Sequence, residues 1–199
     1  MYKTQIETVL KLDAHSRQVF TGCYAIDELA TTTTTSRQRR WKNSGGGGDA
    51  GRFQRACIIN YDESDEPGSH WVAVYNALSS SLRPTHTSSS SSSSSSPEFF
   101  DPAGLPPLDD RIKRYLLGPN YTYNPNVLQQ VQGNACGFYC VYYILQRSRS
   151  VSANDIVEFL SAMTSSRSDY YVKDFIYSQF KPVFNWNAFS FCYKKGGWR

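Results

Sequence analysis

The chain has 199 residues, of which 40% are hydrophobic, and a formal net charge of +4 at pH 7. This length and hydrophobic content predict a single domain over residues 1–199 with one hydrophobic core. The small positive charge permits weak nucleic-acid contact without requiring it, and no apolar run approaches the length of a membrane span.

Two low-complexity stretches interrupt the predicted domain, at about residues 31–51 and 79–96. The first holds a threonine run, a basic patch and four glycines, and the second is rich in serine. Because few of their residues could be buried, we interpret both as insertions in surface loops, which leaves about 160 residues for the core. The basic patch (Arg37–Lys42) and the basic tail (Lys194–Arg199) are interpreted as solvated segments.

The chain has five cysteines, an odd number with irregular spacing. Such a set does not predict a complete disulfide framework. The N-terminal residues also lack the apolar run of a secretory signal peptide. We therefore expect an intracellular protein whose thiols are reduced.

The first half of the chain predicts one amphipathic helix followed by strands. Helical spacing of apolar residues extends over residues 4–20, and residues 20–29 form either a strand or a packed loop. Residues 55–61, 70–76 and 98–101 predict three further strands. We expect the last two to form a hairpin whose tip is enlarged by the serine-rich insertion, because loop-closure entropy rises only logarithmically with length. The apolar residues of the helix are Ile6, Val9, Leu10 and Leu12.

The second half predicts mainly helices. The expected elements are a short helix over 108–117, a strand over 121–124, and helices over 136–147, 152–161 and 168–180. The 136–147 helix is apolar on nearly every side, which is typical of a buried central helix. Ser152, with Asp155 at the N3 position, and Ser168 are the expected caps of the last two helices. The result is an α+β fold in which a small antiparallel sheet packs against a central helix and further helices.

Cys136 is the candidate nucleophile. It begins the predicted 136–147 helix, where the helix dipole favours a thiolate and unpaired backbone N–H groups can donate to it. Gly137 would let a substrate backbone approach without a side-chain clash. Gln132 offers a side-chain amide that, together with the Cys136 N–H, would stabilise the oxyanion of a tetrahedral intermediate.

His70 and Asp101 are the candidate partners of that thiol. His70 begins one strand of the predicted hairpin and Asp101 ends the other, so the two lie within side-chain reach. His70 would serve as general base and then protonate the leaving amine, while Asp101 would orient the imidazole. The remaining histidines, His15 and His86, have no scaffold that aims them at the thiol. The acids that compete with Asp101 are Asp62, Glu98 and Asp109.

The other cysteines are interpreted as structural. Cys140 follows Cys136 at a spacing of four residues, but no second pair of cysteines or histidines stands at ligand spacing. We therefore expect no metal and no other cofactor. Cys140 is assigned to the core, and Cys23, Cys57 and Cys192 to apolar segments.

Four segments resemble the adenovirus-type maturation cysteine proteases (adenain), and even more the related proteases of Maverick/Polinton-type elements and other DNA viruses. They are Phe20–Glu28, Gly68–Tyr75, Phe99–Gly104 and Val131–Gly137. These proteases belong to the same clan as the SUMO-deconjugating proteases. The chain order histidine, acid, cysteine, with a glutamine shortly before the cysteine, matches that clan and differs from papain, in which the cysteine comes first.

The resemblance implies a papain-like α+β fold and a triad of His70, Asp101 and Cys136, with Gln132 as oxyanion donor. It also implies cleavage of viral precursor proteins, commonly after small residues such as glycine. The expected location is the nucleus or virion if the chain is viral, and otherwise the nucleus or cytoplasm. We expect a monomer that does not associate with membranes.

Two departures from adenain concern activation. Adenain is activated by a peptide that becomes disulfide-linked to a cysteine upstream of the glutamine, and here no cysteine lies between Cys57 and Cys136. An activating peptide would therefore act without a disulfide. Adenain also uses DNA as a cofactor, and the patch Arg37–Lys42 is too small to imply more than weak nucleic-acid contact.

The sequence therefore predicts a cysteine endopeptidase that cleaves precursor proteins of a virus or transposable element. The nearest alternative is an isopeptidase that removes a ubiquitin-like modifier. The alternative from another class is a catalytically degenerate copy that only binds protein or DNA. The intact set of His70, Asp101, Gln132 and Cys136 argues against degeneracy.

Overall fold

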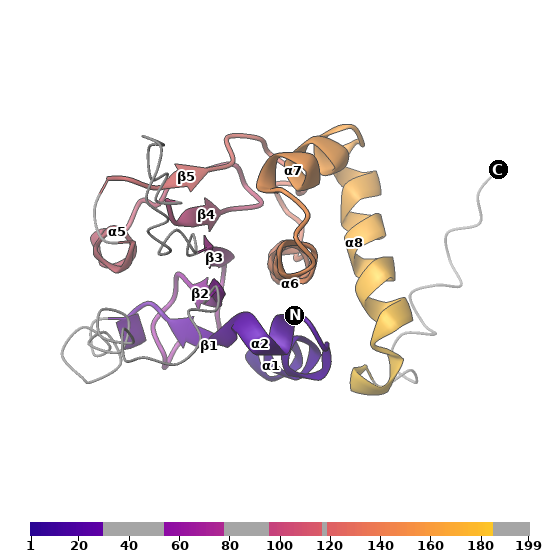
Figure 1. Ribbon diagram of the computed structural model, residues 1–199, viewed down its shortest axis with the longest axis horizontal. Helices are drawn as coiled ribbons and strands as arrows, with labels where there is room; N and C mark the ends of the chain where they lie inside the picture. The colour runs from indigo at the N-terminus through magenta and orange to yellow at the C-terminus, as the bar shows by residue number, and fades with distance from the viewer. Residues whose placement is uncertain (30–53, 78–95, 117–118, 185–199) are drawn as a thin grey trace, which may run out of the picture.

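A five-stranded sheet and a central helix organise the computed structural model, which describes residues 1–29, 54–77, 96–116 and 119–184 (Figure 1). The strands, in their order across the sheet, are β1 (Phe20–Ala25), β2 (Gln54–Asn60), β3 (Trp71–Ala77), β4 (Glu98–Phe100) and β5 (Thr122–Tyr123). The helices are α1 (Lys3–Leu12), α2 (Ser16–Val19), α5 (Asp110–Tyr115), α6 (Cys136–Ser148), α7 (Ala153–Ser161) and α8 (Ser165–Gln179), followed by a 3-10 helix, η1 (Lys181–Val183). None of the helices in these ranges is long and apolar enough to cross a membrane.

The sheet is mixed, so the expectation of an antiparallel sheet is wrong at both edges. Strands β2, β3 and β4 are antiparallel neighbours, whereas β1 is parallel to β2 and β5 is parallel to β4. A parallel neighbour requires a crossover of a dozen or more residues. The chain between β4 and β5 is long enough for one, because it contains α5.

The expected hairpin of β3 and β4 is confirmed. Ala73 pairs with Phe100 and Tyr75 pairs with Glu98 in antiparallel register. His70 directly precedes β3 and Asp101 directly follows β4, so the register brings the two residues to the same end of the hairpin.

The two faces of the sheet belong to different parts of the core. Because side chains alternate along a strand, β2 and β3 send Ile58, Ala73 and Tyr75 to one face and Ile59, Val72 and Val74 to the other. Figure 1 shows α6 on the first face and α5 on the second. Burial on both faces explains why these strands are nearly continuous apolar runs in the sequence.

Helix α6 is the centre of the larger core cluster, as the apolar pattern predicts. Every residue from Cys136 to Leu145 is buried. The helix lies between the sheet and α8, with α1 and α2 beside it (Figure 1). This helix therefore holds its first residue, Cys136, in a fixed position relative to β3.

The predicted helix over residues 4–20 is wrong as a single element. It ends at Leu12, which is 59% exposed, and α2 begins at Ser16. The carboxylate of Asp13 accepts hydrogen bonds from the backbone N–H groups of His15 and Ser16, and so competes with continuation of α1.

The predicted cap is confirmed for α7 and wrong for α8. The Ser152 cap of α7 is confirmed, because its hydroxyl accepts from the Asp155 N–H at 3.0 Å. The predicted cap Ser168 is wrong: α8 starts at Ser165 after Thr164, and Ser168 is buried inside the helix. Most of both insertions (31–51 and 79–96), together with Arg37–Lys42, His86, Cys192 and Lys194–Arg199, lies outside the described residues.

Candidate active site

Cys136 begins α6 and lies against the start of β3. Its side chain is 7% exposed, and the backbone N–H groups of Trp71 and Gly137 donate to its sulfur. The carbonyl of Trp71 in turn accepts from Cys140 Sγ at 3.2 Å, four residues along the helix. The first turn of α6 is thereby attached to one residue of β3, and the thiol points toward the end of the hairpin that carries His70.

His70 contacts both Asp101 and Cys136. Its Nε2 lies 2.8 Å from Asp101 Oδ1, and the ring also hydrogen-bonds the Cys136 thiol. Asp101 is 1% exposed, while the side chain of His70 is 24% exposed. The structure therefore brings together three of the four residues that the sequence singles out, with the imidazole between the acid and the thiol.

The electrostatics of this group favour a charged thiol and a charged imidazole. Burial opposes both charges. However, hydrogen bonds to Asp101 and Cys136 and the charges of these two groups raise the pKa of His70 to about 9. For Cys136, the hydrogen bond from His70, the N–H groups of Trp71 and Gly137, and the His70 charge outweigh burial and lower the pKa below its ordinary value. Both shifts favour a thiolate–imidazolium pair over the neutral thiol and imidazole.

The pKa values of the other described cysteines are shifted in the opposite direction. Burial raises the pKa of Cys57 to about 12, and it also raises those of Cys23 and Cys140. Their thiols stay protonated and pack in the core, as expected for these three residues. Among the described cysteines, only Cys136 has the properties of a nucleophile.

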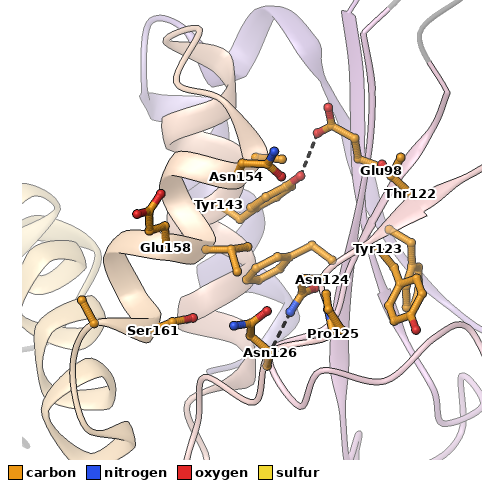
Figure 2. A pocket seen from close by; sticks show the side chains of 15 residues that line it. Glu98, Thr122, Tyr123, Asn124, Pro125, Asn126, Tyr143, Asn154, Glu158 and Ser161 are labelled. Carbon is orange, nitrogen blue, oxygen red and sulfur yellow. Dashed lines mark hydrogen bonds between the residues drawn. The ribbon is translucent and has the colours of Figure 1, made fainter.

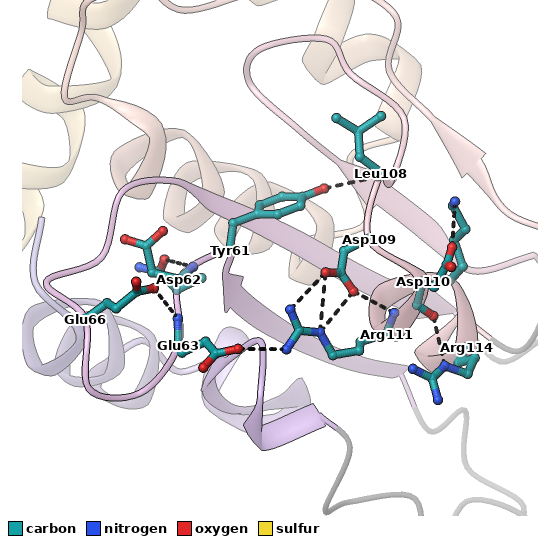
Figure 3. Close-up of polar contacts among 11 residues, drawn as sticks. Tyr61, Asp62, Glu63, Glu66, Leu108, Asp109, Asp110, Arg111 and Arg114 are labelled. Atoms are coloured by element: carbon teal, nitrogen blue, oxygen red, sulfur yellow. Dashed lines mark hydrogen bonds and ion pairs between the residues drawn. The ribbon is translucent and has the colours of Figure 1, made fainter.

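Each acid that competed with Asp101 has a different partner. Asp62 accepts a hydrogen bond from Ser69, and Glu98 pairs with Arg147. Asp109 caps α5 and forms an ion pair with Arg111, which also reaches Glu63 (Figure 3). None of these contacts involves the imidazole, which leaves Asp101 as the acid that contacts His70.

Tyr61 supports the imidazole and was not found by sequence reasoning. Its ring stacks on His70 with centroids 5.8 Å apart, and its backbone N–H donates to the His70 carbonyl at 3.0 Å. Its hydroxyl accepts from the backbone N–H of Leu108 at 3.4 Å (Figure 3). Burial raises the pKa of Tyr61 to about 12, so the hydroxyl stays neutral. In the sequence Tyr61 looks like the end of a strand, and nothing there indicates the contact.

Gln132 makes no hydrogen bond with His70, Asp101 or Cys136 in the described part of the chain. It is exposed on the loop before α6, and its side chain makes no hydrogen bond within the described residues. The same loop contains a second glutamine of interest, Gln129, which is 8% exposed and whose Oε1 has no partner in the described part of the chain. The oxyanion role of Gln132 therefore stays a prediction.

Helix α8 fixes the loop that carries Gln132. The Asp169 carboxylate accepts from the Tyr139 hydroxyl at 2.9 Å and from the Gln130 N–H, and Lys173 donates to Asn134 at 3.1 Å. A side chain at Gly133 would come within 2.9 Å of Asp169 Oδ2, so the close approach requires glycine there. The loop before the thiol is therefore held from the side opposite the sheet.

Gly137 packs closely against other parts of the chain. A Cβ at this position would lie 3.1 Å from Met1 Cβ, 3.4 Å from a Trp71 ring carbon and 3.5 Å from Ile6 Cδ1. The space beside the residue is occupied by the chain's own core side chains. Gly137 thus permits close packing of the start of α6 against the N-terminus and β3, and the expected approach of a substrate backbone stays a prediction.

No arrangement that could hold a metal ion, with three or more histidine, cysteine or acidic side chains, occurs among the described residues. The three side chains His70, Asp101 and Cys136 instead have the arrangement needed for nucleophilic attack by a thiolate beside a proton donor.

The fold is that of a cysteine protease. A crystal structure of the African swine fever virus pS273R protease superposes with a TM-score of 0.52 and 19% identity, over 86% of this chain and 65% of that one. This likeness confirms the expected α+β, papain-like cysteine-protease fold. A structure of the SUMO protease Ulp1, with its catalytic cysteine oxidised to a sulfinic acid, gives a TM-score of 0.45 and 14% identity, over 85% and 78% of the two chains.

The comparison of sequences finds the same viral protease as a relative. The chain is similar to the cysteine protease S273R of African swine fever virus, with 27% identity over 124 residues. The match covers 57% of this chain and 40% of the viral protein, so the chain spans less than half of the curated relative that it matches. No family model matches the chain.

Proposed function

We propose that this chain is a cysteine peptidase whose nucleophile is Cys136. The observation that carries the proposal is the position of His70, which lies 2.8 Å from Asp101 Oδ1 and hydrogen-bonds a thiol whose pKa is lowered. A buried thiolate–imidazolium pair is costly unless it is stabilised, and here the acid, two backbone N–H groups and a helix N-terminus stabilise it.

Each residue has one task in the proposed reaction. The Cys136 thiolate attacks the carbonyl carbon of the scissile bond, and the imidazolium of His70 then gives its proton to the leaving amine. Asp101 keeps the ring oriented and stabilises its charged form. The oxyanion is held by the Cys136 N–H and the side chain of Gln132. A water molecule, deprotonated by His70, finally hydrolyses the acyl-enzyme.

The proposed substrate is a polypeptide, and in particular a precursor protein of a virus or transposable element. The similarity to a viral cysteine protease and the resemblance to adenain-like maturation proteases support this choice. Weak nucleic-acid contact through Arg37–Lys42 and activation by a peptide that forms no disulfide are further parts of the proposal.

The test is to treat the protein with a peptide that carries a thiol-reactive electrophile and to locate the adduct by mass spectrometry. We expect labelling at Cys136 that is lost in His70→Ala. Cys57→Ser serves as the matched control, because Cys57 is buried with a raised pKa and its removal should leave labelling unchanged. Equal labelling of Cys23, Cys57 or Cys192 would refute the proposal.

A second measurement separates endopeptidase from isopeptidase activity. Short glycine-containing peptides and a folded ubiquitin-like conjugate are offered in competition. Preferential cleavage of the peptides supports an endopeptidase, and preferential cleavage of the conjugate supports an isopeptidase. Binding of DNA or protein that survives Cys136→Ala, with no cleavage by the parent, would instead indicate a degenerate copy.

A further inference from the structure

The side chain of Asn124 hydrogen-bonds both the N–H and the carbonyl of Asp101. It follows β5 directly and is 7% exposed. Its Nδ2 donates to the Asp101 carbonyl at 2.7 Å, and its Oδ1 accepts from the Asp101 N–H at 2.9 Å. A third hydrogen bond, from Nδ2 to the Asn126 carbonyl at 3.2 Å, is visible in Figure 2 and fixes the plane of the amide. Every polar atom of this side chain is therefore engaged.

The carboxylate of Asp101 depends on the position of that backbone. Asp101 Oδ1 faces His70 at 2.8 Å and also accepts from the Ala103 N–H at 2.7 Å, within the turn that begins at Asp101. The side chain of Asp101 is short, so a shift of its backbone moves Oδ1 by a similar distance. Three contacts therefore set the orientation of the Asp101 carboxylate: the imidazole of His70, the 101–104 turn and Asn124.

The segment around Asn124 is attached to the same turn at further points. The N–H groups of Leu128 and Gln129 donate to the Pro102 carbonyl at 2.9 and 3.2 Å. Gly104 has a φ of +73°, and a side chain there would meet the backbone of Asn126 at 2.7 Å. The 124–129 segment and the 101–104 turn therefore form one unit, which leads into the loop before Cys136.

We propose that Asn124 is a positioning residue for the reaction, which acts through Asp101 on the orientation of His70. The inference rests on the proposed function. Asparagine suits the task because one short planar group supplies both a donor and an acceptor at the spacing of a peptide N–H and C=O. Aspartate lacks the donor. Alanine removes the partner of the buried Asp101 N–H and leaves the Asp101 carbonyl with the hydrogen bond from the Gly104 N–H at 2.9 Å.

Two neighbouring asparagines provide matched controls. Asn124 also lines a cavity of about 520 Å³ between β4, β5 and α7, and Asn126 and Asn154 line the same cavity (Figure 2). Asn126 contributes its main-chain carbonyl to the contact with Asn124, so Asn126→Ala retains that bond. Asn154 is exposed on α7 and makes no hydrogen bond with the Asp101 turn among the described residues.

The experiment compares Asn124→Ala and Asn124→Asp with Asn126→Ala and Asn154→Ala in the full chain. For each variant, kcat, KM, the pH dependence of Cys136 alkylation and the thermal midpoint are measured. A displacement of about 1 Å in a catalytic group can cost 100-fold in rate. We expect Asn124→Ala to lower kcat by 10- to 100-fold with little change in KM, and to raise the pH at which Cys136 becomes reactive. Asn124→Asp should lie between this variant and the parent, and both controls should match the parent.

The outcomes distinguish this inference from the proposed function. If the parent shows no alkylation of Cys136 that depends on His70, the proposed function fails. If the parent shows it and Asn124→Ala has the same kcat and alkylation profile, only the role of Asn124 is overturned. A variant whose thermal midpoint falls while its pH profile is unchanged would show that Asn124 is merely structural. If Asn124→Ala does not fold, an unshifted alkylation profile of Asn124→Asp overturns the inference.

Discussion

Helix α6 forms a charged contact with the β3–β4 hairpin at each of its ends. At its start, the Cys136 thiol, whose pKa is lowered, hydrogen-bonds His70, which directly precedes β3. At its end, Arg147 pairs with Glu98 of β4 through two contacts of 2.6 and 2.7 Å. In both cases the sign of the charge on α6 agrees with the helix dipole, which favours an anion at the N-terminus and a cation at the C-terminus.

The two contacts differ in how far their side chains are exposed. Arg147 also donates to the Val151 carbonyl at 2.6 Å and lies 4.7 Å above the ring of Tyr75, while Glu98 accepts from the Tyr143 hydroxyl at 2.7 Å. Separating Arg147 or Glu98 from these partners would therefore cost a large free energy. The Cys136 sulfur accepts from His70 and from the N–H groups of Trp71 and Gly137, but its partner His70 is 24% exposed, against 12% for Arg147 and 17% for Glu98. The same helix therefore carries an enclosed ion pair at one end and the more accessible pair of the proposed reaction at the other.

Removing His70 should have the largest effect on the reactive end. In His70→Ala, kcat/KM should fall by at least about 1,000-fold, because the thiolate loses its counter-charge and the leaving amine loses its acid. The pKa of Cys136 should rise, which is measured as the pH dependence of alkylation by iodoacetamide. The control is His15→Ala, since His15 is exposed beside α2. An unchanged alkylation profile in His70→Ala would refute the thiolate–imidazolium pair.

Removing Arg147 should affect stability instead. The side chains of Arg147 and Glu98 are only 12% and 17% exposed, so Arg147→Met leaves Glu98 without compensation. The free energy of unfolding should fall by about 3 kcal/mol, as measured by urea denaturation. The double variant Glu98→Gln/Arg147→Met should recover part of this loss. Alkylation of Cys136 in the folded single variant should be unchanged; a shifted profile would mean that the two ends of α6 are not independent.

The sequence predicts the local part of this arrangement and misses the long-range part. Helix α6 and the β3–β4 hairpin follow from apolar patterns, and the contact between His70 and Asp101 follows from that hairpin. The pairing of Arg147 with Glu98 joins residues 49 positions apart, and no local pattern indicates it. The packing of Gly137 is missed for the same reason, because its neighbours Trp71 and Ile6 are distant in sequence.

The edges of the sheet show a second limit of sequence reasoning. Short strands such as β5 (Thr122–Tyr123) carry too few residues to reveal whether they run parallel or antiparallel to a neighbour. The roles of Tyr61 and Asn124 were invisible as well, since each acts through a backbone or ring contact with a residue of another segment. The sequence therefore indicates which residue types are present at the site, and the fold determines how they are supported.

The pH dependence of activity should follow the charged pair. Activity should rise as pH increases through the lowered pKa of Cys136 and fall about tenfold per pH unit above the pKa of His70, about 9. Because the folded-state pKa of His70 is raised above its ordinary 6.5, its contribution to stability is complete below pH 6.5 and is lost as pH rises through 9. Asp101→Asn should move the descending limb to lower pH, since the hydrogen bond to a carboxylate helps to raise that pKa. A limb that stays in place would contradict the role of Asp101.

The smallest effect is expected at Tyr61, which supports the reactive end without a charge. Tyr61→Phe keeps the ring that stacks on His70 and loses the hydrogen bond from Leu108, so kcat should change by less than about threefold. Tyr61→Ala removes the stacking and should lower kcat by about fivefold, because such a contact contributes about 1 kcal/mol to the orientation of the ring. Steady-state kinetics at a pH on the plateau measures both variants. If Tyr61→Phe were as impaired as Tyr61→Ala, the Leu108 contact would matter more than the stacking. The position of His70 would then depend on the 105–109 loop, and not on the ring of Tyr61.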